Sequence, residues 1–443
     1  MTRSPDVTAY TSANDGGLYL RLFSPRVGAS LTVQLQGTDV VRDRCAKLGT
    51  DLGKVTSAFR ARRPLTAAEA GRELGRIAKI GRNFLFGALA APFEDFHRLA
   101  QFLRAACPTW RDRSLPPPLL HCVAELDRYF PWELLPLFEP DATMTDVRDQ
   151  PGLERAGLAF PGFAAIVERV DPDHIPDSSF LVGWRPLPIR VVYDGSYPGA
   201  HEEVGFFRGN GQLFRLEGPY PRDVTDGAAP SLAEQLCDPA LGVDGRRTAT
   251  PDQVVHFACH CAAPTGDTSG FGYRLADENG RLLMVRLDDL ADEMMRQHWR
   301  RRSRSGDAPG DGGASVAGGS RSPVPKPLVF LNACGTAVMD PASAVSLLRP
   351  FHANRNRGVI GTAANVPDRA AAKVSRWFYT DLVRAGAEVG EALHAAKWRL
   401  LQDLGNPLGL LYSVHALAAL RLTPIPYPRA RGSHEGTRHQ SLA

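Results

Sequence analysis

Residues 254–261 read VVHFACHC, and residues 327–337 read PLVFLNACGTA. In each stretch a short run of large apolar residues ends in a reactive side chain, His260 in the first and Cys334 in the second. Such runs are typical of strands that are buried on both faces of a parallel sheet. Ligands bind beyond the carboxyl ends of these strands, because side chains there are exposed on a rigid support. We therefore expect two neighbouring strands, about 5 Å apart, that bring His260 and Cys334 together.

The sequence around these two stretches alternates apolar runs with helical patterns from Pro188 onward. This alternation favours an α/β fold with a mostly parallel sheet and helices on both of its faces. The expected strands are residues 189–193, 212–216, 254–258, 328–332 and 359–362, with a last strand within 408–422. The expected helices lie near residues 201–208, 231–237, 341–353, 369–385 and 389–403.

The first 115 residues follow a different pattern. Two β-prone runs, 18–23 and 31–36, precede helical stretches, one of which opens with the capping-box sequence TAAE at 66–69. We expect residues 1–115 to form a mixed, mainly helical region that serves regulation or partner binding. Three prolines end this region, and the chain from there to about residue 186 is expected to be mostly loops after one short strand.

Two segments have too few large apolar residues to order themselves. Residues from about 301 to 327 are rich in Gly, Ser and Pro, and they lie between the two strands that carry His260 and Cys334. The second segment is the tail, residues 423–443. We expect a disordered insertion and a disordered tail.

The composition is that of a folded protein, since 43% of the 443 residues are apolar and 23% are charged. A net charge of +4 does not call for a nucleic-acid partner, and the arginine cluster at 296–304 is more typical of a solvated surface. Neither a leader peptide nor a membrane-inserted segment is expected, which favours a cytoplasmic location. Seven scattered cysteines indicate free thiols and not a disulfide framework.

Cys334 and His260 form a chemically sensible pair. A thiol with its ordinary pKa of about 8.5 is only slightly ionised near pH 7, and a neighbouring imidazole promotes its ionisation and later protonates the leaving group. Gly335 lets the backbone turn tightly after the thiol and aim amide groups at a developing oxyanion. These residue types predict nucleophilic catalysis by Cys334 with His260 as the general base.

The same residue types also allow other interpretations. A cysteine at the end of a strand is often a packing residue, but the matching placement of His260 favours chemistry for Cys334. His256 lies inside the strand and is expected to be a core or supporting histidine. A zinc site is not expected, because neighbouring strand residues point to opposite faces and no second Cys/His pair completes a tetrahedral site.

The same stretches resemble the CHAT family of caspase-like cysteine peptidases, which belongs to the caspase and separase clan. The resemblance includes FPWELL at 130–135, VVHFACH at 254–260, LNACGTA at 331–337 and GVIGTAANVPD at 358–368. It continues through the helical pair and NPLGLLYSVHAL near the C-terminus. The resemblance implies a caspase-like peptidase domain over residues 116–422.

The family pattern assigns the general base to His260 and the nucleophile to Cys334, in agreement with the chemical argument. It implies an oxyanion hole formed by backbone amides of Cys261 and Cys334. The family usually has glycine after the catalytic histidine, where this chain has Cys261. The resemblance also implies cleavage of a protein substrate through a thioester acyl-enzyme, with no metal or organic cofactor.

The leading hypothesis is a regulated cysteine endopeptidase with a protein substrate and an activating protein partner. The resemblance implies a role in bacterial defence or programmed cell death. One alternative, suggested by Cys261, is a catalytically silent caspase-like adaptor. The other is a cysteine acyltransferase or amidase that uses the same pair of residues.

Overall fold

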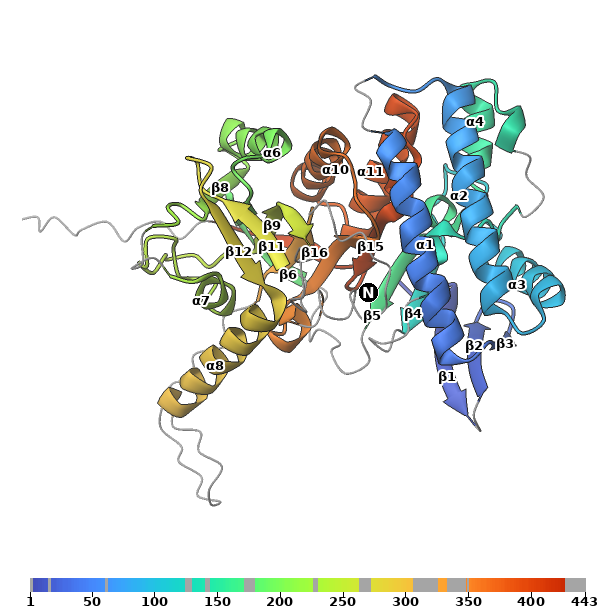
Figure 1. The fold of residues 1–443 in the computed structure, drawn as a ribbon, viewed down its shortest axis with the longest axis horizontal. Helices are drawn as coiled ribbons and strands as arrows, with labels where there is room; N and C mark the ends of the chain where they lie inside the picture. Colours follow the sequence, from blue (N-terminus) through green and yellow to red (C-terminus); the bar gives the residue numbers. More distant parts are fainter. Residues whose placement is uncertain are drawn as a thin grey trace, which may run out of the picture.

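A computed structural model gives the fold of the chain (Figure 1). The residues that the structure describes are 3–14, 17–59, 63–123, 130–139, 144–170, 180–225, 230–262, 272–305, 326–332, 348 and 350–426.

The strands alternate along the chain with helices and short helical turns. The strands are β1 (Val7–Asn14), β2 (Gly17–Ser24), β3 (Ala29–Leu35), β4 (Leu119–Val123), β5 (Ile166–Val170), β6 (Phe180–Arg185), β7 (Leu187–Tyr193), β8 (Phe214–Tyr220), β9 (Val254–Ala258), β10 (His260–Ala262), β11 (Gly272–Ala276), β12 (Leu282–Arg286), β13 (Leu328–Leu331), β14 (Gly358–Thr362), β15 (Tyr412–His415) and β16 (Arg421–Pro426). The helices are α1 (Thr38–Ala58), α2 (Ala67–Ala88), α3 (Pro92–Ala106), α4 (Gln150–Gly157), α5 (Pro161–Ala164), α6 (Pro198–Gly209), α7 (Leu232–Cys237), α8 (Leu287–Ser305), α10 (Asp368–Thr380) and α11 (Val389–Leu404). Short helical turns are η1 (Trp132–Leu134), η2 (Met144–Asp146), η3 (Asp381–Ala385) and η4 (Pro407–Leu411).

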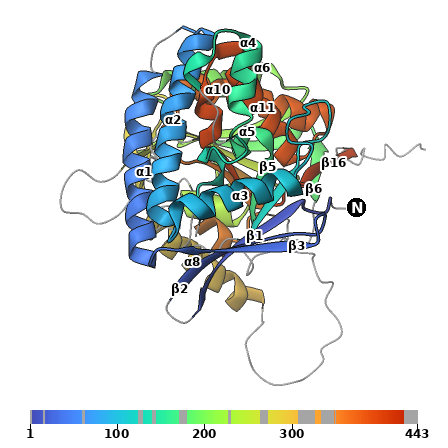
Figure 2. The ribbon, with the colours of Figure 1, turned by 90° about the vertical axis from the view of Figure 1, so that its right-hand side faces the viewer.

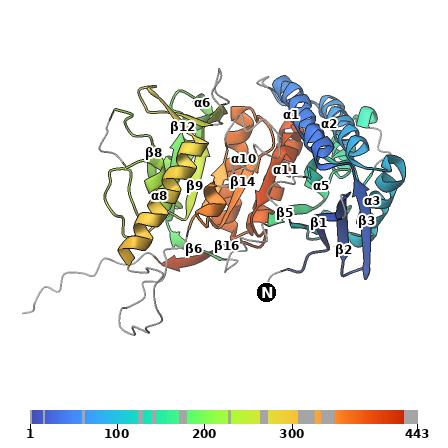
Figure 3. The ribbon, with the colours of Figure 1, turned by 60° about the horizontal axis from the view of Figure 1, so that its bottom comes forward.

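One large sheet runs through the molecule in the order β3-β2-β1-β4-β5-β15-β14-β13-β9-β7-β8. Figure 3 shows it from β8 at one side, through β9, β14 and β5, to β3 at the other. Only the β1–β2, β2–β3 and β14–β15 pairs in this sheet are antiparallel, so the sheet is mostly parallel as expected. Two small sheets, β10-β11-β12 and β16-β6, accompany it.

Helices cover both faces of the large sheet because its central strands are apolar on both faces. Alternate strand residues belong to two separate clusters of buried side chains: Phe330 packs in one cluster with α6, α10 and α11, and Val329 packs in the other with α7 and α8. The predicted α/β class with helices on both faces is confirmed.

The N-terminal helices α1, α2 and α3 pack over the other half of the sheet. Figure 2 shows α1 and α2 side by side, with α3 crossing near β1 and β3. The Thr66 capping box is present: its side chain accepts from the Glu69 backbone N–H, and the Glu69 side chain accepts from the Thr66 backbone. The strands β1 to β3 join the large sheet through the parallel β1–β4 pair, so the sheet continues across the boundary predicted near residue 115.

Several elements differ from the expectation. The passage up to residue 186, expected to be mostly loops, contains β5, β6 and α4. Strand β5 carries two charged residues, and for this reason its sequence does not indicate a buried strand. Both are buried beside partners: Glu168 lies 2.5 Å from the His121 imidazole, and Arg169 donates to Glu133 (2.6 Å).

The structure describes parts of the segments in which an insertion and a tail are expected. Helix α8 continues to Ser305, and Lys326 donates to Asn354 (2.9 Å), so only residues 306–325 of the insertion lie outside the described residues. Strand β16 pairs with β6 as far as Pro426, which leaves 427–443 of the tail outside. Most of the helix expected near 341–353 also lies outside the described residues.

None of the helices in the described part of the chain has the length and apolar character that a membrane-spanning segment needs.

Gly358 provides a test of how tightly the central strands pack. It begins β14 with φ +151°, and a Cβ there would lie 2.2 Å from the Cβ of Ala416. We expect Gly358→Ala to lower the free energy of unfolding by about 2 kcal/mol or more, from backbone strain and steric overlap. Gly361→Ala, in the same strand with open space around the new Cβ, is the control and should change stability by less than about 1 kcal/mol. Urea unfolding of both variants checks this, and equal losses would contradict it.

Candidate active site

Strands β9 and β13 lie side by side near the middle of the large sheet and run parallel. In their register, facing residues are 74 positions apart, as in Leu331 and Phe257 (331 minus 257). The proposed pair is also 74 positions apart (334 minus 260). Cys334 itself lies outside the described residues, and Asn332 is the last described residue before it. The predicted adjacency of the two strands is confirmed.

His260 begins the short strand β10 directly after the end of β9. Its half-buried ring meets the ring of Tyr197 nearly edge to face, with centroids 3.9 Å apart and an interplanar angle of 82°. Tyr197 follows the end of β7, where its backbone N–H donates to the carbonyl of Asp194 (3.0 Å). Strand β7 pairs with β9, so neighbouring strands position the histidine and the tyrosine that packs on it.

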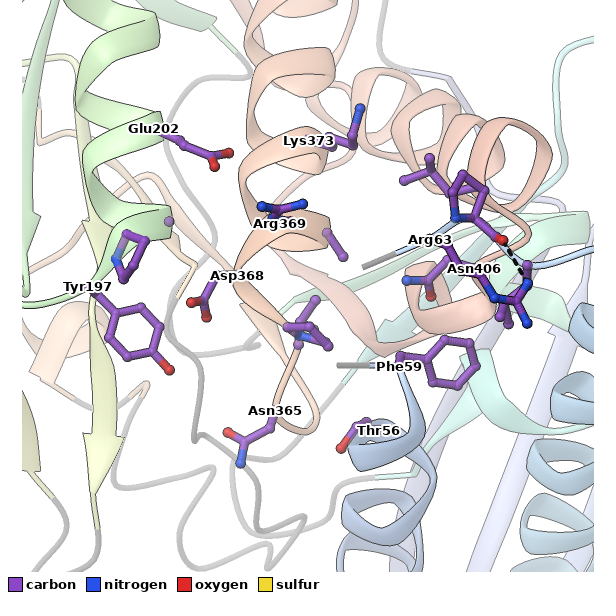
Figure 4. Close-up of a pocket in the computed structure, with 18 of the residues that line it drawn as sticks. Thr56, Phe59, Arg63, Tyr197, Glu202, Asn365, Asp368, Arg369, Lys373 and Asn406 are labelled. Carbon is purple, nitrogen blue, oxygen red and sulfur yellow. Dashed lines mark hydrogen bonds between the residues drawn. The ribbon is translucent and has the colours of Figure 1, made fainter. Parts of the chain in front are cut away.

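His260 opens into a cleft of about 720 Å³. One wall comes from the N-terminal helices: Thr56, Phe59 and residues 63–65. The other walls come from the start of α6, the loop and helix at 365–370 with Lys373, and the end of α11. Figure 4 shows Tyr197 and Glu202 on one side, Thr56 and Phe59 on the other, and Asp368 with Arg369 between them.

The cleft carries both signs of charge. Glu202 and Asp368 are acidic, and Arg369 and Lys373 are basic and exposed. Arg63 is held by Glu69 in an ion pair (2.6 Å), and this contact lowers the pKa of the Glu69 carboxyl to about 2. The lining can therefore contact a peptide of either charge.

The Cys261 side chain lies away from the cleft. Successive strand residues point to opposite faces, and Cys261 faces Tyr273 across the β10–β11 ladder. Both side chains pack in the buried cluster beneath the small sheet, and Cys261 is only 6% exposed. Burial raises the pKa of the Cys261 thiol above its ordinary value. Its thiol therefore does not crowd the site, and the part predicted for its backbone amide stays a prediction.

The other described cysteines are also packing residues. Cys45, Cys107, Cys122, Cys237 and Cys259 are all buried. Burial raises the pKa of Cys107 to about 12 and that of Cys122 further still. Within the described ranges, no three His, Cys, Asp or Glu side chains are grouped so that they could hold a metal ion.

His256 lies in the core, as the sequence predicts, and is fully buried. Its Nε2 is 2.6 Å from Glu203 Oε2, and its Nδ1 is 3.1 Å from the hydroxyl of Tyr379. The same Glu203 oxygen accepts from the side-chain amide of Asn332 (2.9 Å). The Asn332 carbonyl oxygen accepts from the hydroxyl of Tyr412 (2.8 Å). We call these five residues the polar network.

The sequence did not identify Glu203, Tyr197 or Tyr412. Glu203 lies on the buried side of α6 together with Ala200, Val204 and Phe207. The sequence did contain one signal for Glu203, namely a carboxylate among the apolar positions of a helix. Such a group needs a polar partner in the core. Tyr197 had no comparable signal, because its contact with His260 depends on the pairing of β7 with β9.

The burial of these thiols predicts a labelling pattern. Native protein treated with iodoacetamide at pH 7 to 8 should leave the six described cysteines unmodified, because alkylation needs an accessible thiolate. The raised pKa of Cys107 keeps this thiol protonated until the pH approaches 12. Peptide mass spectrometry before and after unfolding in urea measures this, and fast native labelling of Cys261 would contradict the packing described above.

Comparisons with known proteins found relatives of this region of the chain. The CHAT domain model matches residues 232–415. A curated protein of Vitiosangium sp. (strain GDMCC 1.1324), described as a probable protease, is 35% identical over 103 residues. This match covers 23% of the present chain and 13% of that relative.

Among solved structures, two crystal structures of the Saccharomyces cerevisiae separase–securin complex align with the chain at 10% identity, with TM-scores of 0.41 and 0.40. The alignments cover 94% and 95% of this chain and 30% of the matched chain. The resemblance inferred from the sequence is confirmed by the match of the CHAT domain model to residues 232–415.

Proposed function

We propose that the protein is a cysteine endopeptidase in which Cys334 is the nucleophile and His260 the general base. The observation that supports this most is the register of β9 and β13, whose offset equals the separation of the two residues. Adjacent strands are about 4.8 Å apart, so two chains that leave the sheet in this register start within reach of a thiol–imidazole contact. The probable-protease description of the Vitiosangium relative agrees with a peptidase.

The proposed chemistry begins with ionisation of the thiol. The His260 imidazole takes the proton of Cys334, and the thiolate attacks the carbonyl carbon of the scissile peptide bond. The edge of Tyr197 against His260 restricts the rotation of the imidazole ring. The ring thus stays at the edge of the sheet where the substrate carbonyl must lie.

The carbonyl oxygen becomes an oxyanion as the C–S bond forms. Backbone amides, among them those of Cys261 and Cys334, are proposed to donate to this oxyanion. The imidazolium of His260 gives its proton to the leaving amine as the C–N bond breaks, and a thioester remains on Cys334. Water, deprotonated by His260, then attacks the thioester and releases the carboxylate product and the thiol.

The cleft beside His260 has the volume of a typical ligand pocket, which lies between about 300 and 1,000 Å³. Phe59 and residues 63–65 give the N-terminal region one wall of this cleft. We propose that the N-terminal region regulates the entry of a protein substrate, and that an activating partner acts through it. An activating partner and a defence or cell-death role rest on the resemblance to the CHAT family.

Cleavage and thiol reactivity together test the proposal. Wild-type protein incubated with a proteome-derived peptide library should create new peptide termini, and Cys334→Ala should lower their yield by at least about a thousandfold because the nucleophile is lost. His260→Ala should slow iodoacetamide labelling of Cys334 at pH 7 about tenfold or more, since an unassisted thiol is only slightly ionised. This defect should shrink as the pH rises through about 8.5, where the thiol ionises unaided.

Cys107→Ala is the matched control, because it removes a buried thiol that lines neither the cleft nor the proposed oxyanion hole and leaves the proposed nucleophile in place. Cleavage that persists in Cys334→Ala would overturn the assignment. Labelling of Cys334 that is slow and independent of His260 would favour the adaptor. Fast labelling with amide or ester transfer products, and no peptide cleavage, would favour the acyltransferase or amidase.

A further inference from the structure

Asn332 occupies a special place in the fold. It follows the last residue of β13 at the carboxyl edge of the sheet, two positions before Cys334. Its side chain is buried, with 4% of the residue exposed, and has a partner at each end of the amide. The NH₂ group donates to Glu203 (2.9 Å), and the carbonyl oxygen accepts from Tyr412 (2.8 Å).

The chemistry of the partners fixes the orientation of this amide. An ionised carboxylate only accepts hydrogen bonds, so the group that faces Glu203 must be the NH₂. The oxygen of Asn332 then meets the hydroxyl of Tyr412, which donates. Asn332 therefore has one satisfied orientation, and its side chain joins the end of β13 to α6 on one side and to β15 on the other.

The partners of Asn332 are themselves fixed. Glu203 is 3% exposed, and its Oε2 also lies 2.6 Å from His256 Nε2. A single carboxylate oxygen therefore contacts both the Asn332 amide and the His256 imidazole. The hydroxyl of Tyr379 lies on the other ring nitrogen of His256, and burial raises the pKa of Tyr379 well above its ordinary value. Phe207 and Phe330 pack against the same imidazole. The polar network is thus enclosed by aromatic rings.

A network of this kind is costly for stability alone. A buried carboxylate loses its hydration, and an apolar replacement of similar volume is often equally stable. What the polar network adds is a unique geometry, because moving Asn332 would break its hydrogen bonds to Glu203 and Tyr412 in a buried place. Catalytic groups need positions fixed to about 0.5 Å. The network fixes the backbone at the last described residue before the proposed nucleophile.

We propose that Asn332, held by Glu203 and Tyr412, is a positioning residue that fixes the chain leading to Cys334 relative to His260. The inference rests on the proposed function of Cys334. Asn332 touches no reacting atom in this account. It acts by holding the end of β13 in register with the strand that leads to His260.

An exchange of charge between two positions tests this proposal. Asn332→Asp keeps the shape but puts a second carboxylate against Glu203, so we expect iodoacetamide labelling of Cys334 to slow about ten- to a hundredfold at pH 8. The double variant Asn332→Asp with Glu203→Gln restores one amide and one carboxylate. The new amide has two N–H donors, one for the new carboxylate and one for Nε2 of His256, whose proton then lies on Nδ1 and is donated to the Tyr379 hydroxyl. The rate should therefore return to within about threefold of wild type.

The pH dependence of the single variant gives a second readout. Two close carboxyls share a proton, which raises the pKa of the pair above that of an isolated carboxyl. The shared proton is present at low pH and is lost as the pH rises through the raised pKa. The labelling rate of Asn332→Asp relative to wild type should therefore improve as the pH falls from 8 to 5, whereas the double variant should show no such trend.

Gly358→Ala is the matched control for lost stability. It strains β14 at its amino end, opposite the edge that carries His260, and should leave the labelling rate of folded protein within about twofold of wild type. A folded Asn332→Asp variant that behaves like this control, or a double variant that is not rescued, would overturn the positioning role alone. Wild-type Cys334 that labels no faster than an ordinary free thiol would overturn the proposed function and this inference together.

Discussion

The parallel hydrogen-bonded pairing of β9 with β13 is the constraint on which the rest of the site depends. Four consecutive residue pairs fix the register of these two strands, and β7 and β14 flank them on either side. Because all four strands are buried on both faces, none can slip without exposing core residues. Everything at the carboxyl edge, including His260, Tyr197 and Asn332, takes its place from this ladder.

The two faces of these strands have different chemistry. Val255, Phe257, Val329 and Leu331 point into the apolar cluster under α7 and α8, and the buried Arg190 of β7 meets Gln235 of α7 beside it. The opposite face carries His256 and leads to Asn332, and α6 contributes Glu203 to meet them. A carboxylate is tolerated in that layer because the Asn332 amide donates to it and the His256 imidazole lies within hydrogen-bonding distance. The polar network thus lies next to the carboxyl edge of these strands, and the apolar cluster packs on the opposite face.

The sequence correctly predicted the strands that a local run of apolar residues defines. The strands 254–258 and 328–332 were recognised with nearly the right ends, since an uninterrupted apolar run needs no knowledge of partners. Strand β5 was missed because Glu168 and Arg169 find their buried partners His121 and Glu133 tens of residues away. The role of Tyr197 depends likewise on distant pairing. The role of Cys261 was inferred from a family pattern, whereas the direction of its side chain follows only from the β10–β11 register.

The position of β15 has a consequence for how the protein is made. This strand, residues 412–415, lies between β5 and β14 and joins the two halves of the large sheet. During synthesis both halves precede it, so each presents an unpaired strand edge until β15 has left the ribosome. Tyr412, which holds Asn332, belongs to the same late strand. Until then the nascent chain has no continuous sheet, and Asn332 lacks its hydrogen bond from Tyr412. The proposed active site can therefore form only after β15 has been synthesised.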